Sequence, residues 1–161
     1  MMSILLPLVL IFTGSPVIFG AAKPVPVDPF NLRNPKKDMA LVSIAGPATN
    51  FLIAAVAALF LKLGVTFIHN PLIFEAIFTI VKLNLLLGIF NLIPIPPLDG
   101  SKVVALFLPD QTAKSYLALG SIGFFIIFAL LLFPFGGFSL GTIISQLVGF
   151  GLKILGLRPL Y

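Results

Sequence analysis

Residues 84–100 read NLLLGIFNLIPIPPLDG, and this stretch decides the fold class. An apolar run ends at residues 94–97, PIPP, which no helix passes through intact. Asp99 follows immediately, and an ionisable group beside a membrane span is a functional candidate by default. Broken backbone at membrane depth is tolerated only where protein buries it or where it lines a water-filled cavity. The stretch therefore predicts a membrane helix broken by proline, with Asp99 facing such a cavity.

The local pattern also allows a simpler interpretation of Asp99. The carboxylate could be the N-cap of a second short helix that starts near Ser101, at the membrane surface. Gly100, next to it, permits a turn with positive φ. The residues alone leave open whether Asp99 binds a cation, relays a proton or caps a helix.

The composition of the chain independently favours a membrane protein. Of its 161 residues 59% are hydrophobic and only 9% are charged, whereas about a quarter of the residues of soluble domains are charged. The net charge of +5 comes from basic residues at segment ends, and no basic run interleaved with aromatics points to nucleic acid. The chain has no cysteine, which excludes thiolate metal ligands and a thiol nucleophile.

Hydrophobic segments of spanning length predict an all-α polytopic membrane protein with about five transmembrane helices. The chain is expected to form a single integral membrane domain, 1–161, because its length allows one domain. A signal peptide is a weaker interpretation of the first segment, which has no Lys or Arg at its start. The polar, proline-rich residues 23–38 are expected to form a loop. The predicted spans are residues 3–22, 39–62, 73–93, 115–133 and 139–157.

The distribution of Lys and Arg predicts the orientation, because short basic loops stay in the cytoplasm. The 23–38 loop carries four basic residues, whereas the 134–138 hairpin carries none. We therefore expect a multi-pass protein of the cell membrane with Asp99 toward the cytoplasmic side. The C-terminus is expected on the same side and Met1 on the opposite side.

Two motifs in this chain resemble those of a known family. Residues 91–100, NLIPIPPLDG, look like the NxxPxPxLDG motif of the site-2 proteases, which are intramembrane zinc metalloproteases. Residues 46–50, GPATN, resemble the GPxxN motif on the preceding core helix of that family. Residues 22–35 resemble the loop before that helix in small members, so the resemblance covers about residues 20–110 in order.

The resemblance implies an enzyme, a metal and a substrate class. In the family the Asp of LDG is the third zinc ligand, which corresponds to Asp99. Asn50 and Asn91 correspond to positions that orient the substrate or the ligands, and the remaining motif residues are Gly46, Pro47, Pro94, Pro96 and Gly100. The expected activity is that of a metalloendopeptidase that cleaves transmembrane segments of membrane proteins during regulated intramembrane proteolysis. The sequence identifies neither the particular substrate nor the oligomeric state.

The chain departs from the family in one respect. The family's other two ligands are the histidines of an HExxH motif, whose Glu is the general base, and this motif is absent here. His69 is the only histidine, has no Glu beside it and is expected in a loop on the side opposite to Asp99. This chain alone is therefore expected to be inactive, as an N-terminally truncated member whose histidines are expected upstream. The alternatives are a non-catalytic membrane-binding relative of the same fold and, less favoured, a small transporter using Asp99 and Lys82.

Lys82 is a charged residue within a predicted span. The preferred interpretation is that its side chain snorkels toward headgroups or a cavity. Pairing with Glu75, seven residues earlier on the same helical face, is possible but weak. The sequence gives no functional account of Lys82.

Overall fold

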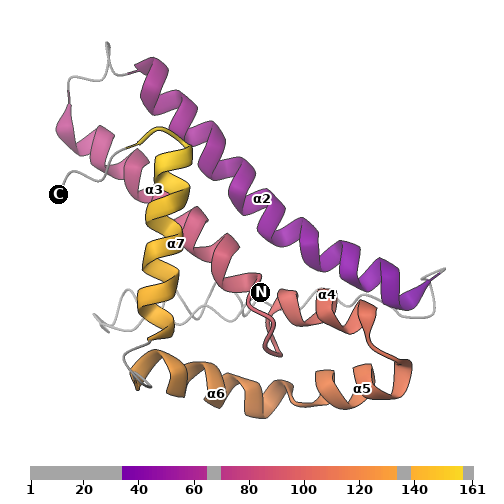
Figure 1. Ribbon diagram of the computed structural model, residues 1–161. Helices are drawn as coiled ribbons and strands as arrows, with labels where there is room; N and C mark the ends of the chain where they lie inside the picture. The colour runs from indigo at the N-terminus through magenta and orange to yellow at the C-terminus, as the bar shows by residue number, and fades with distance from the viewer. Residues whose placement is uncertain (1–33, 65–69, 134–138, 158–161) are drawn as a thin grey trace, which may run out of the picture. The chain divides into compact units, whose positions relative to one another are not determined.

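The computed structural model describes residues 34–64, 70–133 and 139–157, which lie in the compact unit Arg33–Tyr161 (Figure 1). These ranges contain helices and no strand, which confirms the all-α class for the described part of the chain. The helices are α2 Pro35–Gly64, α3 Pro71–Asn91, α4 Asp99–Phe107, α5 Asp110–Ala118, α6 Gly120–Leu132 and α7 Leu140–Ile154. The span predicted at 3–22 and most of the 23–38 loop lie outside the described residues.

Helix α2 begins four residues earlier than the predicted span at 39–62. Asn34 precedes it, and the carboxylate of Asp38 accepts a hydrogen bond of 3.1 Å from the Asn34 backbone N–H. Pro35 fits the first turn, where a helix has no use for the missing N–H. The end of the expected 23–38 loop is therefore helical, because capping chemistry outweighs the proline signal there.

Helix α3 corresponds closely to the predicted span at 73–93. Asn70 is its N-cap, and the side chain of Asn70 accepts a hydrogen bond of 2.9 Å from the Leu72 N–H. Pro71 occupies the first turn. The helix ends at Asn91, just before the PIPP segment, as the sequence predicts.

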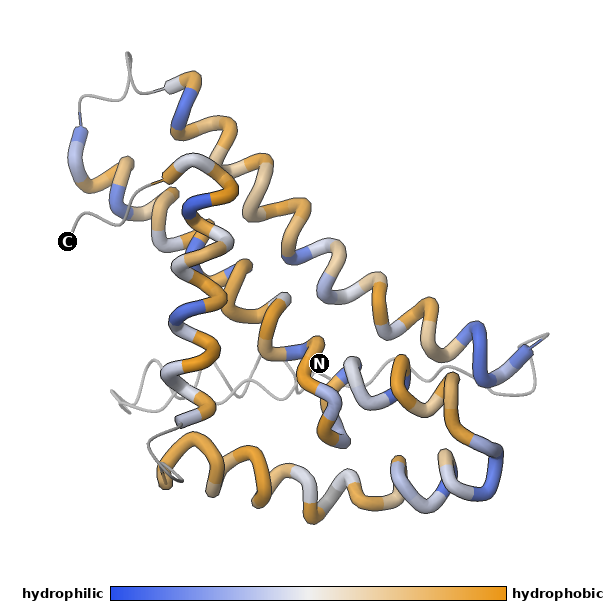
Figure 2. Tube along the Cα trace, viewed as in Figure 1, coloured by the Kyte–Doolittle hydropathy of each residue, from blue (hydrophilic) through white to orange (hydrophobic). Residues whose placement is uncertain are grey.

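Among the described residues, two helices are long and apolar enough to cross a membrane. At 1.5 Å per residue, α2 with 30 residues is about 45 Å long and α3 with 21 is about 32 Å long, against about 30 Å of hydrocarbon. Only 22% of the most apolar window of each is buried within the structure. Figure 2 shows apolar residues along the length of both helices. Most of their apolar surface therefore faces outward, as lipid contact requires.

The structure does not confirm five spans. The segment predicted as a span at 115–133 is not one straight helix, because α5 and α6 form a pair bent by 62°. Gly120 and Gly123 bring α6 against the proline break, since a Cβ on Gly123 would overlap the carbonyl oxygen of Pro96. Helix α7 has 15 residues and is too short to span alone. The described part holds two candidate spans, or three if the bent pair counts as one.

The buried core lies between α2 and α3, with α7 packed against α3. Small residues of α2, Ala54 and Ala58, are almost fully buried and admit the larger side chains of α3. Gly88 of α3 has the converse role, because a Cβ there would lie 2.8 Å from the Phe51 ring of α2. Close packing of this kind, rather than hydrophobic driving force, holds helices together in lipid. The core residues are Ala54, Ala58, Leu61, Phe78, Val81, Leu85, Leu152 and Leu157.

Candidate functional site

The proline break turns the chain from α3 into α4 with few regular hydrogen bonds. After Asn91 the backbone N–H of Ile95 donates to the Ile93 carbonyl at 2.9 Å, and that of Leu98 donates to the Ile95 carbonyl at 3.0 Å. Leu98 is the N-cap of α4 and Asp99 is its first residue. The expectation that Asp99 caps this helix is therefore wrong, and its carboxylate is available for other contacts.

Gly100 is needed for space rather than for an unusual backbone angle. Among the described glycines only Gly156 has positive φ, so Gly100 does not use the positive φ that its lack of a side chain permits. A Cβ on Gly100 would lie 2.7 Å from the carbonyl oxygen of Ile93 and would overlap that of Leu92. The glycine therefore lets the start of α4 pack directly on the backbone that leaves α3.

The two oxygens of the Asp99 carboxylate have different neighbours. Its Oδ1 forms an ion pair of 2.9 Å with the Nζ of Lys102, one turn further along α4. Its Oδ2 lies against Gly46 of α2, where a Cβ would be 3.4 Å away. The Asp99 side chain is 30% exposed. The fold thus brings the Gly46 and Asp99 motifs together although 53 residues separate them in the sequence.

The other motif residues lie on the same helices. Asn50 is half-buried on α2, one turn beyond Gly46, and Asn91 is half-buried at the end of α3. Pro47 is fully buried inside α2. Within the break, Pro96 is buried whereas Pro94 is exposed.

Two contacts near the break were not predicted from the sequence: the hydrogen bond of Tyr116 to Pro94 and the ion pair of Lys102 with Asp99. The hydroxyl of Tyr116 on α5 donates a hydrogen bond of 2.6 Å to the carbonyl oxygen of Pro94. Lys102 could have been found from its i,i+3 spacing to Asp99. Tyr116, 22 residues from Pro94, had no such signal.

A separate contact, which we call the Lys36–Asp110 clamp, joins the start of α2 to the turn between α4 and α5. The Nζ of Lys36 donates to the carbonyl oxygen of Leu108 and lies 2.9 Å from Oδ1 of Asp110. The hydrogen bond from Lys36, together with the charge of Lys36, lowers the pKa of Asp110. Asp110 is exposed at the polar start of α5, so the clamp lies outside the apolar helices.

The donor atoms of the described residues do not fit a zinc ion. A catalytic zinc needs three protein ligands and one open position. Within residues 34–64, 70–133 and 139–157, no three His, Cys, Asp or Glu side chains come together to hold a metal. Asp99 supplies one carboxylate, which already pairs with Lys102. His69 lies outside the described ranges. No reaction step through zinc follows from these residues alone.

Comparisons with known proteins identify the class to which this site is related. The chain is 32% identical over 133 residues to the putative zinc metalloprotease YwhC of Bacillus subtilis, covering 79% of this chain and 61% of that protein. It is 34% identical over 122 residues to the zinc metalloprotease MJ0392 of Methanocaldococcus jannaschii, covering 73% of this chain and 34% of that protein. No solved structure matches the chain. The chain is thus a relative of zinc metalloproteases and spans 61% and 34% of the length of these two.

A family model matches part of the chain. Residues 67–134, which include α3, the proline break and Asp99, match peptidase family M50. This family is the site-2 protease family that the Asn91–Gly100 motif resembles, so the similarity covers the candidate site and the helix before it.

Proposed function

We propose that this chain supplies the aspartate half of the metal site of a site-2-type intramembrane metalloprotease. Asp99 is the ligand from this chain, and two histidines of an HExxH helix outside these 161 residues complete the zinc site. The substrate class is a transmembrane segment of another membrane protein, cleaved during regulated intramembrane proteolysis. The match of residues 67–134 to peptidase family M50 supports this proposal.

One contact carries the proposal more than any other. Oδ2 of Asp99 lies against Gly46, and within the described residues only Oδ1 is paired, with Lys102. A ligand oxygen must be free of such a pairing, whereas a purely structural carboxylate is stabilised by having both oxygens paired. Asn50 and Asn91, on the two helices beside it, are the polar groups that would orient a substrate backbone or the ligands. The proline break would let water reach this region.

The first test is the intact mass of the endogenous protein, purified from its native membrane. We expect a mass several kilodaltons above 17.2 kDa, with an HExxH motif in the additional residues. We also expect about one zinc per chain, lost in the Asp99→Asn variant and retained in Lys102→Met, which removes only the ion-pair partner. A mass of 17.2 kDa with no bound zinc would overturn the proposal.

A second candidate function follows because Asp99 is the one metal ligand that the motifs of this chain offer. A chain with this carboxylate but no HExxH motif would be a non-catalytic relative that holds transmembrane segments without cutting them. The same mass measurement separates the two functions. Native protein of 17.2 kDa that still co-purifies with membrane proteins would support this binder.

The proposal includes a multi-pass protein of the cell membrane with Asp99 and the C-terminus on the cytoplasmic side. The chain has no cysteine, so single cysteines can be introduced as reporters without background. We expect the Lys114→Cys and Lys153→Cys variants to react with an impermeant maleimide only after the cytoplasmic face is opened. Labelling of intact cells would overturn this orientation.

A further inference from the structure

Lys82 lies at the centre of an apolar helix, and no described residue around it supplies a counter-charge. It is 11 residues after Pro71 and 9 before Asn91, which places its Cα about 16 and 14 Å from the ends of α3. The four-carbon side chain does not extend over such a distance, so snorkelling to the headgroups does not account for it in an upright helix. Charged residues at this depth usually pair with another charge or line a functional cavity.

The described residues provide Lys82 with only a weak partner. Its Nζ lies 5.3 Å from the centroid of the Phe78 ring, a cation–π contact. The two ion pairs in the described ranges are Lys36 with Asp110 and Lys102 with Asp99, so neither involves Lys82. Glu75 is two turns away, a rise of about 10 Å, and does not pair with it.

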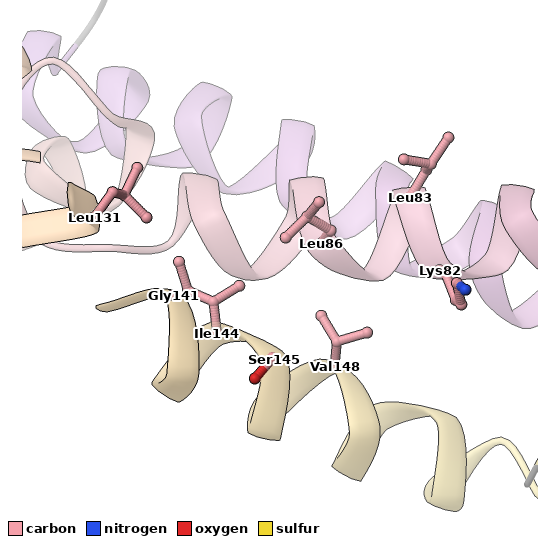
Figure 3. Close-up of a pocket in the computed structure, with 8 residues that line it drawn as sticks. All are labelled: Lys82, Leu83, Leu86, Leu131, Gly141, Ile144, Ser145 and Val148. Carbon is pink, nitrogen blue, oxygen red and sulfur yellow. The ribbon is translucent and has the colours of Figure 1, made fainter. Parts of the chain in front are cut away.

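Lys82 lines an open groove of about 380 Å³ between α3, α6 and α7 (Figure 3). The remaining lining is almost entirely apolar and includes Leu86 and Leu131. Gly141 and Ser145 of α7 face the same groove, so a neighbouring backbone can approach closely on that side. The groove thus combines an apolar wall, a small-residue wall and the side chain of one lysine, whose Nζ lies toward Phe78.

We propose that this groove docks a transmembrane helix of another membrane protein that carries Asp or Glu at mid-depth, with its carboxylate paired to Lys82. Charge complementarity selects this occupant over lipid, because an acyl chain would fill the apolar wall and leave the ammonium group without an anion. The depth of Lys82 in α3 sets the depth of the acidic residue in the partner. This inference does not depend on the metal site, since it concerns binding rather than cleavage.

A second groove provides an internal comparison. It has about 410 Å³, lies between α2, α3 and α7, and is lined by Phe51, Leu85, Leu147 and Phe150 among other residues without charge. Ser145 and Leu147 are both exposed on α7 but line different grooves. Bulky substitutions at these two positions therefore form a matched pair.

The test is association in liposomes, measured by energy transfer between the labelled 161-residue chain and designed single-span helices. The helices are a Leu/Ala host with Glu, Gln or Leu at the central position. We expect the Glu helix to bind about tenfold more tightly than the Leu helix. Lys82→Met should abolish this preference, and Ser145→Trp should weaken binding of the Glu helix while Leu147→Trp leaves it unchanged.

Charge reversal separates a specific pair from a general effect of lysine. The Lys82→Glu variant should no longer bind the Glu helix more tightly than the Leu helix, and it should instead prefer a host helix with a central Lys. Lys153→Met, which removes a cation at the end of α7, serves as the control and should retain the preference. Equal binding of the Glu and Leu helices by the unaltered chain would overturn the proposal and leave lipid as the occupant. The same holds if the preference persists in Lys82→Met.

Discussion

The hydroxyl of Tyr116 donates a 2.6 Å hydrogen bond to the carbonyl oxygen of Pro94, from a helix 22 residues further along the chain. The break has few backbone hydrogen bonds of its own, so this bond fixes the first proline of the PIPP segment. We expect Tyr116→Phe to destabilise the protein by about 1 kcal/mol, because it removes the donor and leaves the carbonyl without it. The measurement is thermal unfolding in detergent. Ser115→Ala, which removes a hydroxyl bonded to its own helix at Gln111, is the control and should have a smaller effect.

Two glycines carry the close packing around the break. A Cβ on Gly100 would overlap the Leu92 carbonyl oxygen, and one on Gly123 would overlap that of Pro96. We expect Gly100→Ala and Gly123→Ala each to cost about 1–3 kcal/mol, because backbone atoms cannot move aside without shifting a helix. Gly149 on α7 has no atom within 4 Å of its Cβ position, so Gly149→Ala is the matched control. It should be neutral or slightly stabilising, since alanine favours the helix. Chemical denaturation in micelles measures all three, and equal effects would contradict this account of packing.

The sequence predicted the positions of α2, α3 and α7 well, but it did not predict the break between α5 and α6. Helix α3 matches the predicted span at 73–93 because Asn70-Pro71 marks the start of its apolar run and the PIPP segment marks the end. The bend between α5 and α6 was missed because it follows from the fit of Gly123 on Pro96, a tertiary contact between segments 27 residues apart. Hydropathy over residues 115–133 records only that the segment is apolar.

The sequence singled out the motif residues of the candidate site but not the contacts between them. The sequence singled out Asp99 and Gly46, and the fold places them in contact. It did not predict that Lys102 pairs with Oδ1, although the i,i+3 spacing allows it. The steric role of Gly100 was also missed, because it depends on where the carbonyls of Leu92 and Ile93 point after the helix ends. Such close approaches are properties of the folded backbone and leave no local pattern.

The Lys36–Asp110 clamp predicts a specific acid sensitivity. The pKa of Asp110 is lowered in the folded protein, so its contribution to stability is fully present above the unfolded value of 3.8. That contribution is lost as the pH falls below 3.8 through the folded pKa. We expect Asp110→Asn to reduce the loss of stability between pH 4 and pH 2, and Lys36→Met to do the same. Lys37→Met, an exposed neighbour, should leave the pH dependence of thermal unfolding unchanged, and identical profiles for all variants would contradict the clamp.

The contact of Gly88 with Phe51 predicts a compensating pair of substitutions. A Cβ on Gly88 would lie 2.8 Å from the Phe51 ring, closer than real contacts allow. We expect Gly88→Ala alone to destabilise the α2–α3 interface by about 1–3 kcal/mol, the usual cost of overpacking. Phe51→Leu shortens the opposing side chain, so adding it should make Gly88→Ala less harmful than it is in the unaltered chain. The double-mutant cycle, measured by unfolding in mixed micelles, should give a coupling energy of about 0.5–3 kcal/mol. Additive effects would mean that the ring moves aside freely and that the two helices are not in close contact at this level.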